Sequence, residues 1–239
     1  ELPYYNSFFG TAHPPVIKLA AQLKKLAPAH ISHVFFTGSG SESNDTNVRL
    51  VRHYWQAKGQ PKKRTIISRY NAYHGSTMAA MSLGGMKGMH DQGGIIDGIE
   101  HIMQPHWYHE TLAGESEEDF GLRAAQALET KILEVGADHV GAFIGEPVQG
   151  AGAVIVPPTS YWPEIQRICK KYDILLIADE VITGFGRTGN WFASETLGIE
   201  ADLMTIAKGL SSGYMPIGGV LISDRVAEVV IEGGEFAHG

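Results

Sequence analysis

The sequence has 239 residues but only one cysteine, Cys169, and no apolar run of the length that spans a membrane. One cysteine excludes an internal disulfide, and with it a small secreted scaffold that depends on such bonds. The first five residues carry neither the basic start nor the apolar stretch of a signal peptide. These absences predict a protein of the reducing cytoplasm.

Positive charge is also scarce, because 19 lysines and arginines stand against 26 aspartates and glutamates, which gives a net charge of −7. An acidic chain is poorly suited to binding nucleic acid or an anionic membrane, so we expect neither as a partner. The first residue is not methionine, and residues 235–239 resemble neither a closing helix nor a polar tail. We therefore expect a fragment, or the ordered part of a longer chain.

Helical and strand patterns alternate along the chain, with no internal repeats and no clear linker between them. Amphipathic or capped runs predict helices over residues 16–26, 42–58, 76–82, 121–135 and 161–172. Short apolar runs predict strands over residues 33–37, 64–68, 140–144, 174–178, 203–207 and 219–222, whereas residues 84–119 are predicted to be mostly loop. Strands separated by helices predict an α/β fold with a mainly parallel sheet and helices on both faces.

Ligands of such sheets bind beyond the carboxyl ends of the strands, so the residues after each strand are candidates for the site. The run Ser39-Gly40-Ser41 lies between a predicted strand and a helix, where free N–H groups and the helix dipole suit a phosphate. An ordinary helix cap would have the same composition. Clusters of the 29 glycines at strand ends likewise indicate either tight turns or a backbone close to a ligand.

Two charged residues end apolar strands. Asp179 ends the most apolar run of the chain, where a carboxylate is costly without a cation or several donors. Lys208 follows another apolar run, and partial burial there would lower its pKa and make it a better nucleophile. Each residue alone is more simply a turn or surface residue. Together with the phosphate site they fit pyridoxal phosphate (PLP), which requires an anion cradle, an imine lysine and a carboxylate facing its ring nitrogen.

Five short motifs, in order along the chain, resemble those of the class III aminotransferases, which have the fold type I PLP architecture. The most specific are Asp-Glu-Val with Gly-Arg-Thr-Gly, and Ala-Lys-Gly. The motifs occupy residues 38–45, 73–76, 145–150, 178–189 and 205–209. The resemblance spans roughly residues 30–239 and implies that these form a large PLP-binding domain, incomplete at its C-terminal end, after an N-terminal helical segment over residues 1–29. The C-terminal small domain of the family would be absent.

The resemblance implies a role for each residue that matches a motif. Ser39, Gly40 and Ser41 would bind the cofactor's phosphate. Tyr73 would stack on the PLP ring, with His74 beside it.

The remaining site residues follow the central strands. Asp179 would face the ring nitrogen, Val181 would contact the opposite ring face, and Glu146 would be an acid that helps to hold the site. Lys208 would be the imine lysine, and later the base that moves a proton between the substrate's α-carbon and the cofactor. No metal is implied.

The position after Gln149-Gly150 narrows the expected substrates. Glutamate-handling members of the family typically carry a Glu there, which gates an arginine for the second carboxylate, whereas this sequence has Ala151. The chain is therefore more similar to the ω-amino acid and amine:pyruvate aminotransferases. The implied reaction moves an amino group from an amine or ω-amino acid to a keto acid such as pyruvate, in a homodimer. The family's substrate arginine and partner-subunit phosphate contact would lie outside this segment.

Other interpretations stay open or are disfavoured. The same scaffold could serve a PLP-dependent aminomutase or decarboxylase, or a non-catalytic binding protein. The run 184–189 fits a dinucleotide fingerprint, but it comes five residues after the strand's end and no clear long helix follows. His101, His106 and His109 lack the spacing of a metal site and are expected in a loop. Cys169 is expected to pack in the core.

Overall fold

The computed structural model describes residues 11–233 and Phe236. Its centre is a seven-stranded sheet with the strand order β1-β7-β6-β5-β4-β2-β3. The strands are β1 (Ile31–Thr37), β2 (Thr65–Arg69), β3 (Ile99–Ile102), β4 (Val140–Gly145), β5 (Leu175–Asp179), β6 (Leu203–Ile206) and β7 (Gly218–Ser223).

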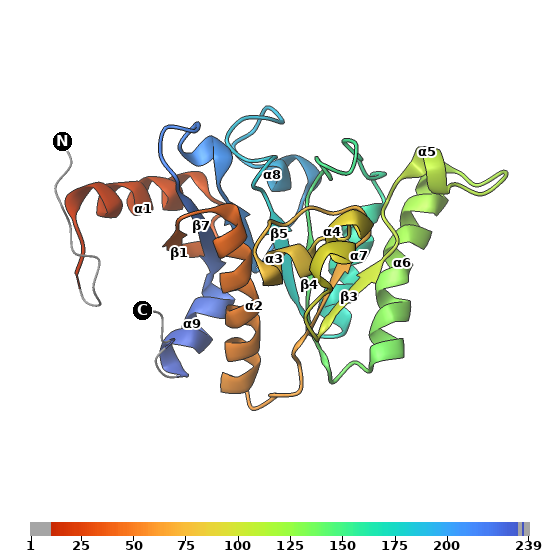
Figure 1. Cartoon of the computed structure of the whole chain (residues 1–239), viewed down its shortest axis with the longest axis horizontal. Helices are drawn as coiled ribbons and strands as arrows, with labels where there is room; N and C mark the ends of the chain where they lie inside the picture. Colours follow the sequence, from red (N-terminus) through yellow and green to blue (C-terminus); the bar gives the residue numbers. More distant parts are fainter. Residues whose placement is uncertain (1–10, 234–235, 237–239) are drawn as a thin grey trace.

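The sheet is mainly parallel, as predicted. Strands β3, β2, β4, β5 and β6 pair in parallel, whereas β7 runs antiparallel to both β6 and β1. The carboxyl ends of the parallel strands therefore meet at one edge of the sheet, which is the upper edge in Figure 1.

The helices differ in length and surround the sheet (Figure 1). They are α1 (Pro14–Leu26), α2 (Gly40–Ala57), α3 (Met78–Leu83), α4 (Lys87–Gly93), α5 (Trp107–Glu110), α6 (Glu117–Val135), α7 (Tyr161–Lys171), α8 (Ala193–Leu197) and α9 (Asp224–Glu232), with a 3₁₀ turn η1 at Lys208–Leu210. None of these described helices is long and apolar enough to cross a membrane.

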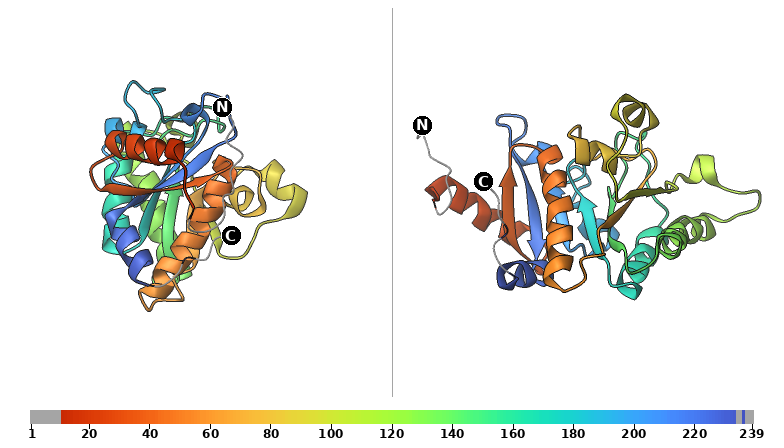
Figure 2. Two further views of the ribbon diagram at one scale, coloured as in Figure 1. Left: turned by 90° about the vertical axis from the view of Figure 1, so that its left-hand side faces the viewer. Right: turned by 60° about the horizontal axis from the view of Figure 1, so that its bottom comes forward.

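Two hydrophobic cores lie on opposite faces of the sheet, so the central strands are buried on both sides. Along β5, Leu175 and Ile177 belong to the core under α2, while Leu176 and Ala178 belong to the core under α6 and α7. This alternation explains the continuous apolar run of β5, because successive side chains of a strand point to opposite faces. Figure 2 shows α2 running along the strands.

The segment 84–119 departs from the prediction. It contains α4, β3, α5 and the start of α6 instead of being mostly loop. Strand β3 has only four residues and pairs with β2 alone, at the end of the sheet. His101 lies in this strand and not in a loop, and its Nε2 is 2.7 Å from the carbonyl oxygen of Gly84.

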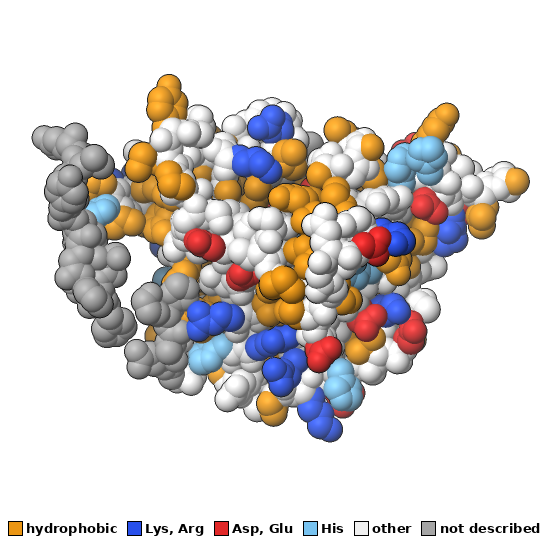
Figure 3. Space-filling view, viewed as in Figure 1, with side chains coloured by type: hydrophobic (Ala, Val, Ile, Leu, Met, Phe, Trp, Pro, Cys, Tyr) orange, Lys and Arg blue, Asp and Glu red, His pale blue; other side chains and the backbone are white. Residues whose placement is uncertain are grey.

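Apolar side chains are prominent near the carboxyl edge. Figure 3 shows them across the upper part of the visible face, with basic side chains among them, and several lysines and arginines near the lower edge.

Candidate cofactor site

A cavity of about 160 Å³ lies at the carboxyl ends of the parallel strands. It is formed by the start of α2, the loop after β2, the end of β5 and the turn after β6. Its lining residues are Gly40, Ser41, Tyr73, His74, Gly75, Asp179, Val181, Ala207 and Lys208. Seven of them were predicted site residues, so the fold brings together groups that are up to 168 residues apart in sequence. Ser39 and Glu146 do not line the cavity.

The first turn of α2 forms one wall of the cavity. Ser39 is the helix N-cap, and its hydroxyl accepts a hydrogen bond from the backbone N–H of Glu42 at 3.2 Å. The Ser41 hydroxyl accepts one from the N–H of Ser76 at 3.1 Å, which ties the helix to the loop after β2. The first N–H groups of a helix have no partner within the helix, so this wall suits an anion.

Two glycines leave space at this wall. A Cβ on Gly40 would lie 3.0 Å from a methyl group of Val181. A Cβ on Gly75 would lie 2.5 Å from the Ser41 hydroxyl oxygen, and the φ angle of Gly75 is +138°. Since side chains are strained at such φ angles, only glycine allows this loop to approach the helix so closely.

Asp179, the last residue of β5, is 2% exposed, and three hydrogen-bond donors surround its carboxylate. Its Oδ2 accepts from Asn44 Nδ2 at 2.8 Å and lies 2.7 Å from His74 Nδ1. Its Oδ1 accepts from the N–H of Val181 at 3.1 Å. These donors offset the cost of burying a carboxylate and fix its orientation at the cavity.

Glu146 supports the site from behind Tyr73 without lining the cavity. One carboxylate oxygen accepts from the N–H of Tyr73 at 3.1 Å and the other from the N–H of Gly150 at 2.9 Å. Burial raises the pKa of Glu146, and the nearby His74 opposes that rise. The Tyr73 backbone is thus anchored while its ring stays exposed beside the cavity.

Lys208 was predicted to be partly buried, and this prediction is wrong. The lysine lines the cavity but is exposed, because the chain leaves β6 at the buried Ala207 and turns into η1. Its φ is +42°, a left-handed conformation that is uncommon for a residue other than glycine. A Cβ on the next residue, Gly209, would lie 2.8 Å from the Cβ of Phe185, so the loop after β5 packs against this turn.

The glycine-rich run 184–189 belongs to that loop and not to a dinucleotide-binding turn. It is followed by the five-residue helix α8. Glu180 is fully buried and accepts hydrogen bonds from the N–H groups of Ala193 and Ser194, which anchors the far end of the loop. The run therefore frames the turn that carries Lys208.

Sequence reasoning overlooked a buried polar group that contacts Asp179. Asn44 appeared only as part of a motif, yet its side chain is fully buried and donates directly to the Asp179 carboxylate. Its position gave a usable signal: Asn44 is four residues after Gly40, so both lie on the same face of α2.

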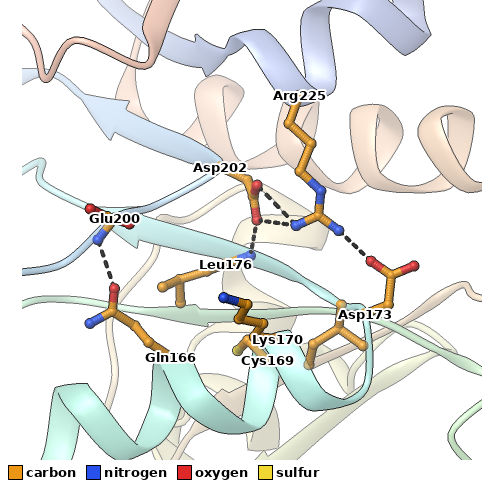
Figure 4. Close-up of a pocket in the computed structure, with 9 residues that line it drawn as sticks. Gln166, Cys169, Lys170, Asp173, Leu176, Glu200, Asp202 and Arg225 are labelled. Atoms are coloured by element: carbon orange, nitrogen blue, oxygen red, sulfur yellow. Dashed lines mark hydrogen bonds and ion pairs between the residues drawn. The ribbon is translucent and has the colours of Figure 1, made fainter.

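A second cavity, of about 440 Å³, lies at the opposite ends of β5 and β6 (Figure 4). Arg225 bonds both Asp173, at 2.6 Å, and Asp202, at 3.2 Å, and Asp202 also accepts the N–H of Leu176 at 2.8 Å. Burial raises the pKa of the Cys169 thiol, which disfavours the reactive thiolate and agrees with a packing role. These groups satisfy one another and form a structural cluster.

Metal ligation finds no support in the part of the chain that the structure describes. Residues 11–233 and Phe236 contain no group of three or more His, Cys, Asp or Glu side chains placed to hold a metal ion. Of the three histidines that were weighed, His101 lies in β3 and His109 in α5, where its ring meets that of the N-cap residue His106 edge to face. The loop position expected for all three is therefore wrong for His101 and His109.

Comparison with known proteins identifies the family. The model of the aminotransferase class-III family matches residues 4–239, so the chain belongs to the class III aminotransferases, which are PLP-dependent enzymes. The predicted family, fold and cofactor are thereby confirmed.

Individual relatives are also aminotransferases. The chain is 61% identical over 241 residues to a putrescine–pyruvate aminotransferase from Pseudomonas aeruginosa, covering 100% of this chain and 52% of that protein. It is 45% identical to a diaminobutyrate–2-oxoglutarate transaminase from Halomonas elongata, again covering 100% and 52%. The structure of the omega transaminase from Pseudomonas jessenii in complex with PMP superposes with a TM-score of 0.96 at 50% identity, covering 100% of this chain and 54% of that one. The chain thus spans about half the length of these relatives.

Proposed function

We propose that this chain is the cofactor-binding part of a transaminase that moves an amino group from an amine or ω-amino acid to a keto acid such as pyruvate. The observation that carries the proposal is the cavity that brings Asp179 and Lys208 together beside the start of α2. Similarity to a putrescine–pyruvate aminotransferase supports the donor and acceptor classes. We also propose that residues 30–239 form one domain, since every strand of the sheet lies within them.

The residues of the cavity fit PLP. The helix start at Gly40 and Ser41, with the space that a Cβ on Gly75 would fill, suits a phosphate. At the other end, Asp179 offers a buried, oriented carboxylate to a ring nitrogen. When bound, PLP supplies an electron sink for the electrons released when the substrate's α-carbon loses a proton.

The chain's own residues then have distinct tasks. Asp179 would hold the proton on the ring nitrogen, and at an effective dielectric constant of about 20 such a contact contributes on the order of 4 kcal/mol. Tyr73 and Val181, which both line the cavity, would cover the two faces of the ring. His74, buried beside Asp179, orients that carboxylate.

Lys208 would hold the cofactor and would then move the substrate's α-proton. Its exposure at the cavity leaves the amine accessible to the cofactor and then to the substrate. The turn that carries it is backed by Phe185 against Gly209, which places the backbone of the lysine beside the cavity. A base positioned beside the reacting carbon accelerates proton transfer.

Ala151 supports an amine or ω-amino acid as the donor. It is exposed in the loop after β4, where glutamate-handling members carry a carboxylate. Without that carboxylate, nothing at this position gates an arginine that grips a second substrate carboxylate. A donor with an amino group remote from any carboxylate fits this arrangement best.

Assembly and location are part of the proposal. We expect a homodimer, because large apolar side chains that would be costly to leave in water are exposed in the loops after β4, β5 and β6. They are Val154, Val156, Trp191, Tyr214 and Met215. A cytoplasmic location is supported by the single buried cysteine of this chain.

The test uses the full-length protein, whose visible absorption is recorded before and after addition of putrescine and then of pyruvate. We expect a cofactor band that the amine removes and pyruvate restores, with no net loss of either carbon skeleton. Because putrescine has no carboxyl group, an amino acid is tested separately without pyruvate. Release of carbon dioxide from it would identify a decarboxylase, and formation of an isomer would identify an aminomutase. No band after incubation with PLP would refute the proposal.

A further inference from the structure

A polar network is buried behind Asp179, between α2 and β6. Asn44, Asn47 and Thr205 are all fully buried, although burying amides and hydroxyls lowers stability unless their hydrogen bonds are made. Thr205 is adjacent to Asp179 in the sheet, on the neighbouring strand β6. The network therefore lies directly against the carboxylate that faces the cofactor cavity.

Asn44 occupies the centre of this network and uses its whole hydrogen-bonding capacity. Its Nδ2 donates to the carbonyl oxygen of His74 at 2.7 Å and to Asp179 Oδ2 at 2.8 Å. Its Oδ1 accepts from Asn47 Nδ2 at 3.0 Å and from the Thr205 hydroxyl at 2.8 Å. An amide has two N–H donors and two oxygen lone pairs, so no capacity remains.

These partners permit only one orientation of the Asn44 amide. If the amide were flipped, its oxygen would face the Asp179 carboxylate and the His74 carbonyl, which are both acceptors. These two acceptors lock the Asn44 donor onto Asp179. The Asn47 amide adds no such constraint, because its own Oδ1 is buried without a partner among the described residues.

We propose that Asn44 is a positioning residue that sets the orientation of Asp179 and thereby the affinity and electronic state of the bound cofactor. This inference rests on the proposed role of Asp179 as the partner of the ring nitrogen. Asn44 lies one helical turn after Gly40, in the same helix that begins at the phosphate wall. One rigid element thus fixes the distance between the two ends of the cofactor site, and its amide also holds the backbone of the loop that carries Tyr73.

The matched test compares Asn44→Ala with Asn47→Ala in the full-length holoenzyme. Both variants remove a buried amide from α2, but only Asn44 donates to Asp179. Three properties are measured: thermal midpoint, the dissociation constant of PLP, and the midpoint of the pH titration of the visible cofactor band. Asn44→Leu, which keeps a similar shape and removes the donor without adding charge, is measured alongside and replaces Asn44→Ala if that variant does not fold.

We expect both alanine variants to lower the thermal midpoint. The Asn44 variants should weaken PLP binding by at least about tenfold, as the loss of a hydrogen bond to a charged group predicts. Asn47→Ala keeps both donor contacts of Asn44 and should change PLP binding much less.

The Asn44 variants should also move the titration midpoint of the cofactor band to higher pH. Without the Asn44 donor, the ring nitrogen would hold its proton less firmly and the ring would carry less positive charge. The nitrogen that Lys208 contributes would then keep its own proton to a higher pH.

Two results would overturn the inference. The first is that an Asn44 variant keeps the wild-type PLP affinity and titration midpoint, although Asp179→Asn changes both. The other is an Asn47→Ala variant that shifts the titration as far as Asn44→Ala, which would make the effect one of general core damage. If Asp179→Asn itself leaves both properties unchanged, the proposed role of Asp179 fails instead, so the two failures are distinguishable.

Discussion

Replacing Asp179 by asparagine keeps the size of the side chain and removes its charge. Three donors surround the carboxylate, two of them at Oδ2 and one, the N–H of Val181, at Oδ1. The asparagine oxygen should therefore take the Oδ2 position, where it keeps the contacts with Asn44 and His74. Its amide group then faces the Val181 N–H, so one hydrogen bond is lost and the orientation of the side chain survives.

The main loss is electrostatic. Two unit charges about 4 Å apart interact by about 4 kcal/mol at an effective dielectric constant of about 20. If all of this contact is made in the transition state of proton removal, the rate falls roughly a thousandfold, since about 1.4 kcal/mol corresponds to a factor of ten. We therefore expect the amine half-reaction of Asp179→Asn to be slower by two to three orders of magnitude, about 10²–10³.

The assay is a single turnover of the full-length holoenzyme with putrescine, followed through the cofactor band in a stopped-flow instrument. The matched control is Asp202→Asn, the same substitution in the structural cluster of Figure 4 at the opposite end of the strands. The control should lose stability but keep the wild-type rate. An Asp179→Asn rate within about tenfold of wild type would refute the assignment of Asp179 to the ring nitrogen.

Three further predictions test the supports of the site and the stability of the fold. Glu146→Gln should lower PLP affinity by about tenfold or more, because the amide cannot accept both backbone N–H groups that the carboxylate binds; equilibrium dialysis measures it. Gly75→Ala should weaken PLP binding by displacing Ser41, and should destabilise the fold by about 1–3 kcal/mol, as seen in denaturant titration. The Arg123 guanidinium holds the pKa of Glu115 at about 2, below its ordinary 4.5, so this ion pair stabilises the fold above pH 4.5 and is lost as pH falls toward 2. Glu115→Gln should therefore lower the thermal midpoint at pH 7, by a margin that shrinks only below about pH 4.5.

Each of these predictions has a result that would contradict it, and Gly75→Ala also has a matched control. Gly88→Ala adds the same methyl group to open space in α4 and should leave PLP affinity unchanged. Wild-type PLP affinity in Gly75→Ala would contradict the prediction, because it would show that the loop at position 75 tolerates a side chain beside Ser41. PLP binding by Glu146→Gln at wild-type strength would remove Glu146 from the site. A Glu115→Gln margin that grows as the pH falls would contradict the assigned direction of the pKa shift.

The sequence predicted the parts of the fold whose pattern is set locally. Strand β5 was evident because its residues are apolar on both faces, and α2 because a serine cap precedes it. Strand β3 was missed since Ile99-Glu100-His101-Ile102 is short, half polar and paired on one side only. The reversed direction of β7 was not predictable, because the alternation of side chains is the same in parallel and antiparallel strands.

The candidate site shows the same division. Residues that follow strands, such as Asp179, could be found from position and chemistry, and the family resemblance supplied their roles. The exposure of Lys208 could not be predicted, because it depends on the turn that the chain takes after Ala207. Asn44 was overlooked because a polar residue in an amphipathic helix is ordinarily exposed, and only the packing of α2 on β5 and β6 buries it.

The most direct test of the account is to locate the residue that binds the cofactor covalently. Full-length protein saturated with PLP is treated with borohydride, which makes a reversible bond between cofactor and lysine permanent, and is then digested and analysed by mass spectrometry. We predict that the cofactor's mass is found on Lys208 and is absent from a Lys208→Ala variant. Attachment to another lysine, or to none, would contradict the account.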